Sequence, residues 1–218
     1  MKPLRKAEAT ILEGYRVALE NAKNQPIIAS EMAELGYDAH KIREGEQLLA
    51  DTQKVYDHKK QEDDETTQAS ANFKSQNQKL DELYKNHRKK AKVIFRKEPE
   101  MLKRLNLLGR IPQNYDLKMD VIRKFYSELQ QDQQLQQKLE TLRVTQKVID
   151  KSIKQVKNVE DKRAEYIKEV GESQDATQQK RMAFAKIDDW MRDFYAVADI
   201  ALEDQPQLME ALGKRRKS

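Results

Sequence analysis

Apolar residues recur along this chain of 218 residues every three or four positions, which is the spacing of one face of an α-helix. The first such segment covers residues 7–23, in which Leu12 and Leu19 share a face. Pro26 suits the first turn of a short second helix, and Gly36 supplies its end. Periodicities this long, with few helix breakers among them, predict an all-α protein.

Two further helical segments in each half of the chain are long. Asp38 is the expected N-cap of a helix that reaches to about residue 61, and a second long helix follows the polar run 62–67. In the second half, Thr145 is the expected N-cap of a helix to about residue 170. Gly171 then stops that helix, and Ser173 caps another. The pattern predicts an α-hairpin of two long helices in each half.

The second half of the chain repeats the first at a displacement of 107 residues. The segment 95–105 aligns without a gap on 202–212, which places Pro99 on Pro206 at the start of a short helix. Only ten of 72 aligned positions are identical. The agreement lies in the apolar class, the prolines and the turn positions, and we therefore expect an internal duplication.

Two hairpins bury their apolar stripes most economically by packing together. The seam from Ile42 to Tyr56 follows alternating steps of three and four, which is typical of coiled-coil packing. We therefore expect an elongated antiparallel bundle of four long helices, with short helices at its ends. It forms a single domain, residues 1–214, made of repeats 1–107 and 108–214. The basic tail, residues 215–218, follows it.

The composition agrees with long helices and argues against several kinds of site. Charged residues make up 36% and hydrophobic residues 38%, with six glycines and five prolines. No cysteine is present, so disulfides and thiolate metal sites are excluded. No Gly-rich phosphate loop or nucleophile elbow occurs, so we expect no enzyme, no catalytic or cofactor-binding residue and no cofactor. Neither a signal peptide nor a run of about 18 apolar residues is visible, so we expect a cytoplasmic protein without a transmembrane segment.

Charge is distributed differently in the two halves, although the net charge is only +5. Residues 85–97 carry seven basic side chains and no acid, whereas the aligned stretch 192–204 carries one basic and four acidic side chains. The two stretches either pair with each other inside the bundle, or the basic one forms an interaction surface for an acidic partner. The candidate surface residues are Lys85, Arg88, Lys89, Lys92 and Arg96.

His87 is the one histidine on an apolar seam, where the aligned residue is Phe194. A helical di-metal site needs Glu-x-x-His pairs on facing helices, and the chain has none. We therefore expect a seam histidine that is satisfied by a neighbouring side chain or by water, and no metal site. A metal or small-molecule site around His87 is kept as the second alternative.

Four segments resemble a group of uncharacterised bacterial all-helical proteins with an internally duplicated α-hairpin. These segments are 104–112, 171–177, 187–191 and 198–208, and the resemblance covers most of the chain. They are loop and helix-end patterns, not active-site signatures. The resemblance implies a bacterial intracellular bundle and transfers no functional residue, because no activity is assigned to the group.

These patterns favour a non-catalytic protein-interaction or scaffolding module whose partner is a protein, with self-association into a dimer as one form. The first alternative is a nucleic-acid-associated protein that uses residues 85–97. Single-strand binders interleave exposed aromatic residues with basic ones, and here the aromatic residues follow the seams. The sequence leaves open whether 85–97 is a binding face or pairs with 192–204.

Overall fold

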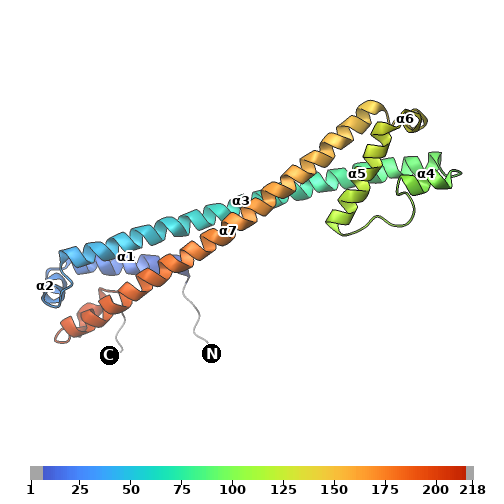
Figure 1. Ribbon diagram of the computed structural model, residues 1–218. Helices are drawn as coiled ribbons and strands as arrows, with labels where there is room; N and C mark the ends of the chain where they lie inside the picture. The colour runs from blue at the N-terminus through green and yellow to red at the C-terminus, as the bar shows by residue number, and fades with distance from the viewer. Residues whose placement is uncertain (1–6, 215–218) are drawn as a thin grey trace. The chain divides into compact units, whose positions relative to one another are not determined.

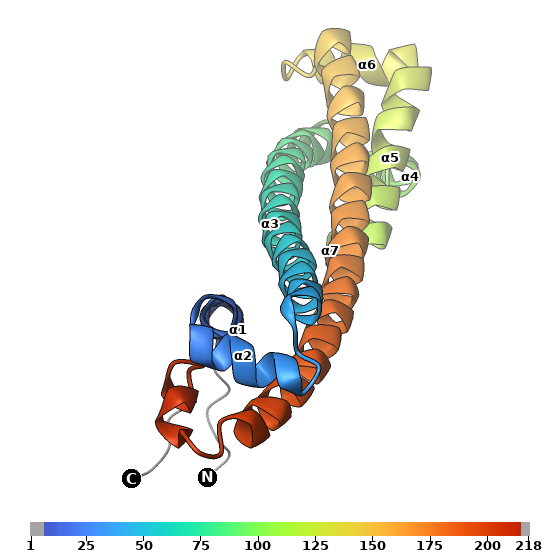
Figure 2. The same cartoon turned by 90° about the vertical axis from the view of Figure 1, so that its left-hand side faces the viewer.

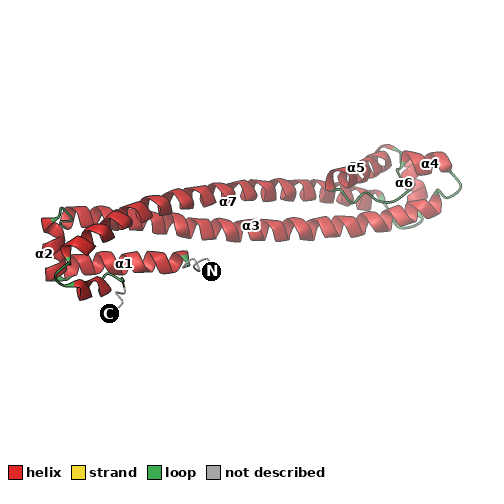
Figure 3. Ribbon diagram, turned by 90° about the horizontal axis from the view of Figure 1, so that it is seen from below, coloured by secondary structure: helices red, strands yellow, loops and turns green. Residues whose placement is uncertain are grey.

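The computed structural model describes residues 7–214, and every element in this range is helical (Figure 1, Figure 3). The prediction of an all-α fold is confirmed. None of the described helices contains a segment that is long and apolar enough to cross a membrane. In chain order the elements are α1 Glu8–Asn24, α2 Pro26–Glu34, α3 Ala39–Ile94, α4 Pro99–Arg104, α5 Tyr115–Gln131, α6 Gln133–Glu140, α7 Gln146–Ala201 and the 3-10 helix η1 Pro206–Glu210.

The α-hairpin predicted within each half is wrong, because α3 and α7 each run as one helix of 56 residues. The polar run 62–67 holds no glycine or proline, and polarity alone does not end a helix. Gly171 lies inside α7, where a single glycine costs about 1 kcal/mol relative to alanine and is tolerated. The long helices that pack together are therefore α3 and α7, and the described residues do not form the expected four long helices.

The starts of the long helices are those that the sequence predicts. The carboxylate of Asp38 accepts hydrogen bonds from the backbone amides of His40 and Lys41, both at 2.9 Å. The hydroxyl oxygen of Thr145 accepts a longer hydrogen bond, of 3.4 Å, from the backbone amide of Val148. Both N-caps are therefore confirmed, and each supplies an acceptor to amides that lack a partner within the helix.

The elements recur along the chain at the displacement of the sequence repeat. The four pairs α1 and α5, α2 and α6, α3 and α7, and α4 and η1 begin 107 residues apart. Backbone angles recur as well, although the residue types differ: φ is +86° at Gly36 and +61° at Arg143, and +51° at Asn106 and +78° at Gly213. Left-handed backbone is common for glycine and accessible to asparagine but unusual for arginine, so at Arg143 the shared turn geometry does not come from local preference alone.

Packing divides the chain into two compact units. Unit 1 contains the described residues up to Asp63 and those from Glu172 onward: α1, α2, the first part of α3, the last part of α7 and η1. Unit 2 is Asp64–Gly171 and contains the remainder of α3 and α7 with α4, α5 and α6. Each unit therefore draws helices from both predicted repeats, and its boundaries differ from those of the repeats.

In unit 1, α1 lies along both long helices (Figure 1). Its last turn meets the beginning of α3 through an ion pair of Lys23 with Glu46 at 2.9 Å, so α1 and α3 are antiparallel. The hydroxyl of Tyr15 donates to Asp188 of α7 at 2.8 Å. The short helix α2 crosses the end of the unit and connects α1 to α3 (Figure 2). These helices enclose the core of unit 1, which includes Leu19, Ile28, Met32, Phe194 and Leu202.

In unit 2, α5 occupies the place that α1 has in unit 1. Lys118 of α5 forms an ion pair with Asp81 of α3 at 2.7 Å. The core of unit 2 includes the fully buried rings of Tyr84, Phe125 and Tyr126, which contact one another edge to face. Aromatic pairs of this geometry add about 0.5–1.5 kcal/mol beyond the area that they bury.

Candidate functional site

The predicted basic surface lies in unit 2, along the last turns of α3 and just beyond them. Lys85 and Lys89 of α3 are exposed, and so is Arg96 after its end. Among the described residues, no carboxylate lies within ion-pair distance of these three side chains. The aligned stretch 192–204 belongs to unit 1, and residues 215–218 of the predicted basic tail lie outside the described range.

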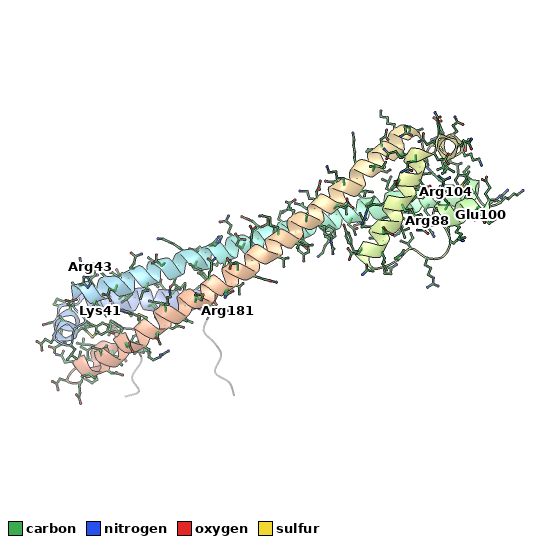
Figure 4. All side chains as sticks on the ribbon, viewed as in Figure 1. Lys41, Arg43, Arg88, Glu100, Arg104 and Arg181 are labelled. Atoms are coloured by element: carbon green, nitrogen blue, oxygen red, sulfur yellow. The ribbon has the colours of Figure 1, made fainter. Side chains whose placement is uncertain are left out.

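Arg88 and Lys92, the other two predicted surface residues, are partly buried. The guanidinium of Arg88 donates to the carbonyl oxygens of Leu107 and Gly109, both at 2.9 Å, and so holds the loop after α4 against α3 (Figure 4). Burial lowers the pKa of Lys92, and the nearby charge of Arg88 lowers it further. The structure therefore separates the predicted set into three exposed cations and two that are partly buried, of which Arg88 holds the loop.

His87 points into the core of unit 2 and is only 4% exposed. Its Nδ1 lies 3.0 Å from the hydroxyl oxygen of Tyr126, itself 1% exposed. Burial lowers the pKa of His87 to about 4, and the charge of Lys90 adds to the effect. The expectation of a seam histidine satisfied by a neighbour is confirmed, and the neutral ring belongs to a buried hydrogen-bonded pair.

The aligned positions in unit 1 are apolar. Phe194 stands where unit 2 has His87, and Leu19 stands where it has Tyr126. The histidine and its hydroxyl partner are thus both replaced. A buried polar group without its partner is costly, so the two positions are expected to change together.

An open groove of about 710 Å³ lies between α1 and α3 in unit 1. Its floor is mainly apolar and its two rims are polar or charged. Along α1 it extends from Ala9 to Asn24, and along α3 from Glu46 to Lys60. The floor includes Leu12, Leu19, Leu49 and Tyr56, and the rims include Glu13, Arg16, Glu20, Gln53 and Lys60.

The charged side chains of the α1 rim form ion pairs with one another. Arg16 donates to Glu13 at 2.7 and 2.8 Å and to Glu20 at 2.6 Å, all three being side chains of α1. The Arg16 guanidinium lowers the pKa of the Glu13 carboxyl, which stays ionised. Across the groove, the amide of Gln53 donates to Asp57 on its own helix at 2.9 Å. No ion pair therefore joins Arg16 to α3, and the middle of the groove stays open.

Unit 2 has the counterpart of this groove between α5 and α7, with a volume of only about 190 Å³. Six residues line it, and each lies 107 positions after a residue that lines the groove of unit 1. Arg123, the counterpart of Arg16, reaches across to Glu160 of α7 at 3.0 Å. The six lining residues are Arg123, Tyr126, Ser127, Gln130, Ile153 and Val156.

Two exchanges explain why the two grooves differ. Glu160 is aligned with Gln53, so the carboxylate that attracts the arginine in unit 2 is a neutral amide in unit 1. Ser127 is aligned with Glu20, so Arg123 also lacks the second acid that holds Arg16 on its own helix. The sequence analysis missed the groove because no residue type marks it; the signal lay in these exchanges between aligned rims.

The groove of unit 1 is suited to binding. Pockets of 300–1,000 Å³ with an apolar lining and a few polar groups accommodate ligands. Its charged groups are carboxylates, an arginine and lysines at the rim. No buried nucleophile with an adjacent base lines it.

No model of a known protein family matches the chain, and neither the curated proteins nor the solved structures include a match.

Proposed function

We propose that this protein is a non-catalytic protein-interaction module, in which the groove of unit 1 receives a helical segment of a partner protein. The observation that carries the proposal is the open groove between α1 and α3, with its apolar floor and charged rims. An amphipathic helix that lays its apolar face into a hydrophobic groove is a recurring mode of protein recognition.

The dimensions of the groove support a helical ligand. Its lining extends over 16 residues of α1, from Ala9 to Asn24, and so over about 22 Å at 1.5 Å per residue. A helix of about four turns has this length and presents apolar residues at the first, fourth, fifth and eighth positions of its buried stripe. The polar rims accommodate the flanks of such a helix.

We also propose that the two halves descend from one duplicated unit, as the sequence repeat predicts. The recurring helix starts, left-handed turns and grooves support this proposal. On this proposal the groove of unit 1 has stayed open, whereas the groove of unit 2 has acquired the ion pair of Arg123 with Glu160 across it.

The proposed function is tested with the full chain, labelled for NMR, and a panel of synthetic amphipathic helices that share one apolar face. We expect the backbone resonances of Leu49 and Gln53 to shift on titration. The matched positions of unit 2, Val156 and Glu160, serve as the internal control and are expected to stay unchanged. Shifts confined to unit 2, or none with any peptide, would contradict the proposal.

The exposed cations of unit 2 favour a second candidate function, the binding of nucleic acid. Lys85, Lys89 and Arg96 have no carboxylate partner among the described residues and lie on one side of α3 and its continuation. Such a set attracts phosphates in a salt-dependent manner. A gel shift at low salt that disappears when these three residues are replaced by glutamate would support nucleic-acid binding. If the parent chain gives no gel shift at low salt, nucleic-acid binding is contradicted.

A further inference from the structure

Lys60 marks one end of the groove of unit 1. It lies opposite the first turn of α1, because α1 and α3 are antiparallel and the other end is closed by the pair Lys23 and Glu46. Its Nζ lies 4.2 Å from the centroid of the Tyr56 ring. No described carboxylate lies within ion-pair distance of Lys60, whereas Arg16 and Lys23 on the other rim are both paired.

The α1 rim has the opposite character. Glu13 and Glu20 share one arginine, so this stretch of the rim carries an excess of negative charge. Their side chains are 61% and 55% exposed, which leaves carboxylate oxygens accessible to a further donor. The groove thus offers a single unpaired cation at one end and a row of carboxylates along one edge.

We infer that the groove of unit 1 binds an amphipathic helix of defined charge pattern. The helix carries an acidic side chain at the end of its apolar face that meets Lys60, and basic side chains along the edge that meets Glu13 and Glu20. This inference rests on the proposed function, because it names the kind of helix that the interaction module takes.

Desolvation is the reason why the charge pattern matters. A helix seated on Leu12 and Tyr56 covers Lys60 on one side and removes part of its hydration. A covered charge without a counterion is penalised, whereas a carboxylate on the ligand restores its partner. The same argument holds for the edge along Glu13 and Glu20, where a basic side chain complements the excess of acid.

A second copy of the chain fits this groove less well. The face of α1 that a second copy would offer carries Glu13, Arg16 and Glu20, which are exposed and charged. That face supplies no apolar stripe for the floor of the groove. The occupant that we propose is therefore a partner helix with its own apolar face and not α1 of a second copy.

The test uses the full chain and two synthetic helices of about four turns with the same leucine face. The matched peptide has glutamate at the Lys60 end and lysines along the Glu13 edge, and the swapped peptide has every charge inverted. Fluorescence anisotropy gives the dissociation constants. We expect the matched peptide to bind at least fivefold more tightly.

Substitutions assign that preference to Lys60. We expect Lys60→Gln to reduce the preference to less than twofold and Lys60→Glu to reverse it. Lys54→Glu is the matched control, because Lys54 is an exposed lysine of α3 that does not line the groove. It is expected to leave the preference unchanged, and far-UV circular dichroism checks that each variant is folded.

The outcomes separate the inference from the proposed function. If the two peptides bind with equal affinity and the resonances of Leu49 and Gln53 still shift, the inferred charge pattern of the ligand is wrong. The proposed helix-binding groove is then still supported. No binding of either peptide and no shift overturn both. Concentration-dependent dimers in sedimentation experiments that compete with the peptides would overturn the inference in favour of a second copy.

Discussion

The indole ring of Trp190 lies directly on the backbone of Gly45, where α7 meets α3 in unit 1. A Cβ atom at Gly45 would lie 2.4 Å from Cη2 of the ring, which is far inside the distance that carbon atoms tolerate. Tyr37 and Phe194 pack against the same ring, so it has little room to move. The missing side chain at position 45 is thus what lets the two helices approach here.

We predict that Gly45→Ala destabilises the protein even though alanine is the better helix former. Overpacking of this kind costs about 1–3 kcal/mol, more than the gain of about 1 kcal/mol in helix propensity. Gly14→Ala is the control, because nothing lies within 4 Å of a Cβ at that exposed position of α1. It should stabilise by about 0.4–1 kcal/mol. Chemical denaturation measures both changes, and equal signs would contradict the close approach.

The buried pair His87 and Tyr126 predicts a non-additive response. His87→Phe introduces the residue of unit 1 but removes the histidine partner of the buried Tyr126 hydroxyl, which keeps only the side chain of Ser152, and we expect a cost of about 1 kcal/mol. Adding Tyr126→Leu removes the hydroxyl that has lost its histidine partner, so we expect the double variant to lose less stability than the two single losses together. A double-mutant cycle by chemical denaturation gives the coupling, and full additivity would contradict it.

The same histidine predicts a dependence of stability on pH. The pKa of His87 is lowered in the folded chain to about 4 from its ordinary value of 6.5, so between these values the unfolded state binds more protons. Its contribution is therefore complete above pH 6.5 and is lost as pH falls towards 4, by up to about 3 kcal/mol. The difference in unfolding free energy between the parent chain and His87→Phe isolates this term. A difference that stays constant from pH 7 to 4 would refute it.

Closing the groove of unit 1 is predicted to weaken helix binding. The pair of substitutions Gln53→Glu and Asp57→Ala reproduces the α7 rim of unit 2, where Glu160 binds Arg123 and position 164 is alanine. We expect Arg16 to turn across the groove and the affinity for the matched peptide to fall at least fivefold. The side-chain Nε–H resonance of Arg16 reports the new ion pair.

Controls for that prediction use the chain itself. Asp57→Ala alone should leave the affinity within twofold, because it adds no carboxylate opposite Arg16. Stability should change by less than about 1 kcal/mol, since Arg16 is exposed and surface ion pairs contribute little. Unchanged binding despite a shifted Arg16 resonance would show that the ligand seats elsewhere.

Arg88 is predicted to act on the loop and not on a ligand. Arg88→Ala removes two hydrogen bonds to the carbonyl oxygens of Leu107 and Gly109, so we expect faster amide hydrogen exchange in residues 105–111. Lys89→Ala, an exposed neighbour on α3, should leave that exchange unchanged. Equal protection in both variants would contradict the role of Arg88.

Local pattern determined much of this fold. The starts of α3 and α7 follow from the N-caps Asp38 and Thr145, because a capped amide needs only its neighbours in the chain. The seam position of His87 followed from helical spacing alone, and its burial agrees. The repeat of 107 residues also came from the sequence, and the helix starts recur at that spacing.

Tertiary structure decided what local pattern left open. The run 62–67 looked like a turn because it is polar, yet a helix continues through polar residues unless a breaker or a packing partner ends it. Arg88 looked like a surface cation, and only the loop after α4 shows what it holds. Whether a groove is open depends on which carboxylate an arginine can reach, as Arg16 and Arg123 show. That distance is set by how helices far apart in the chain pack, so no single segment of the sequence contains it.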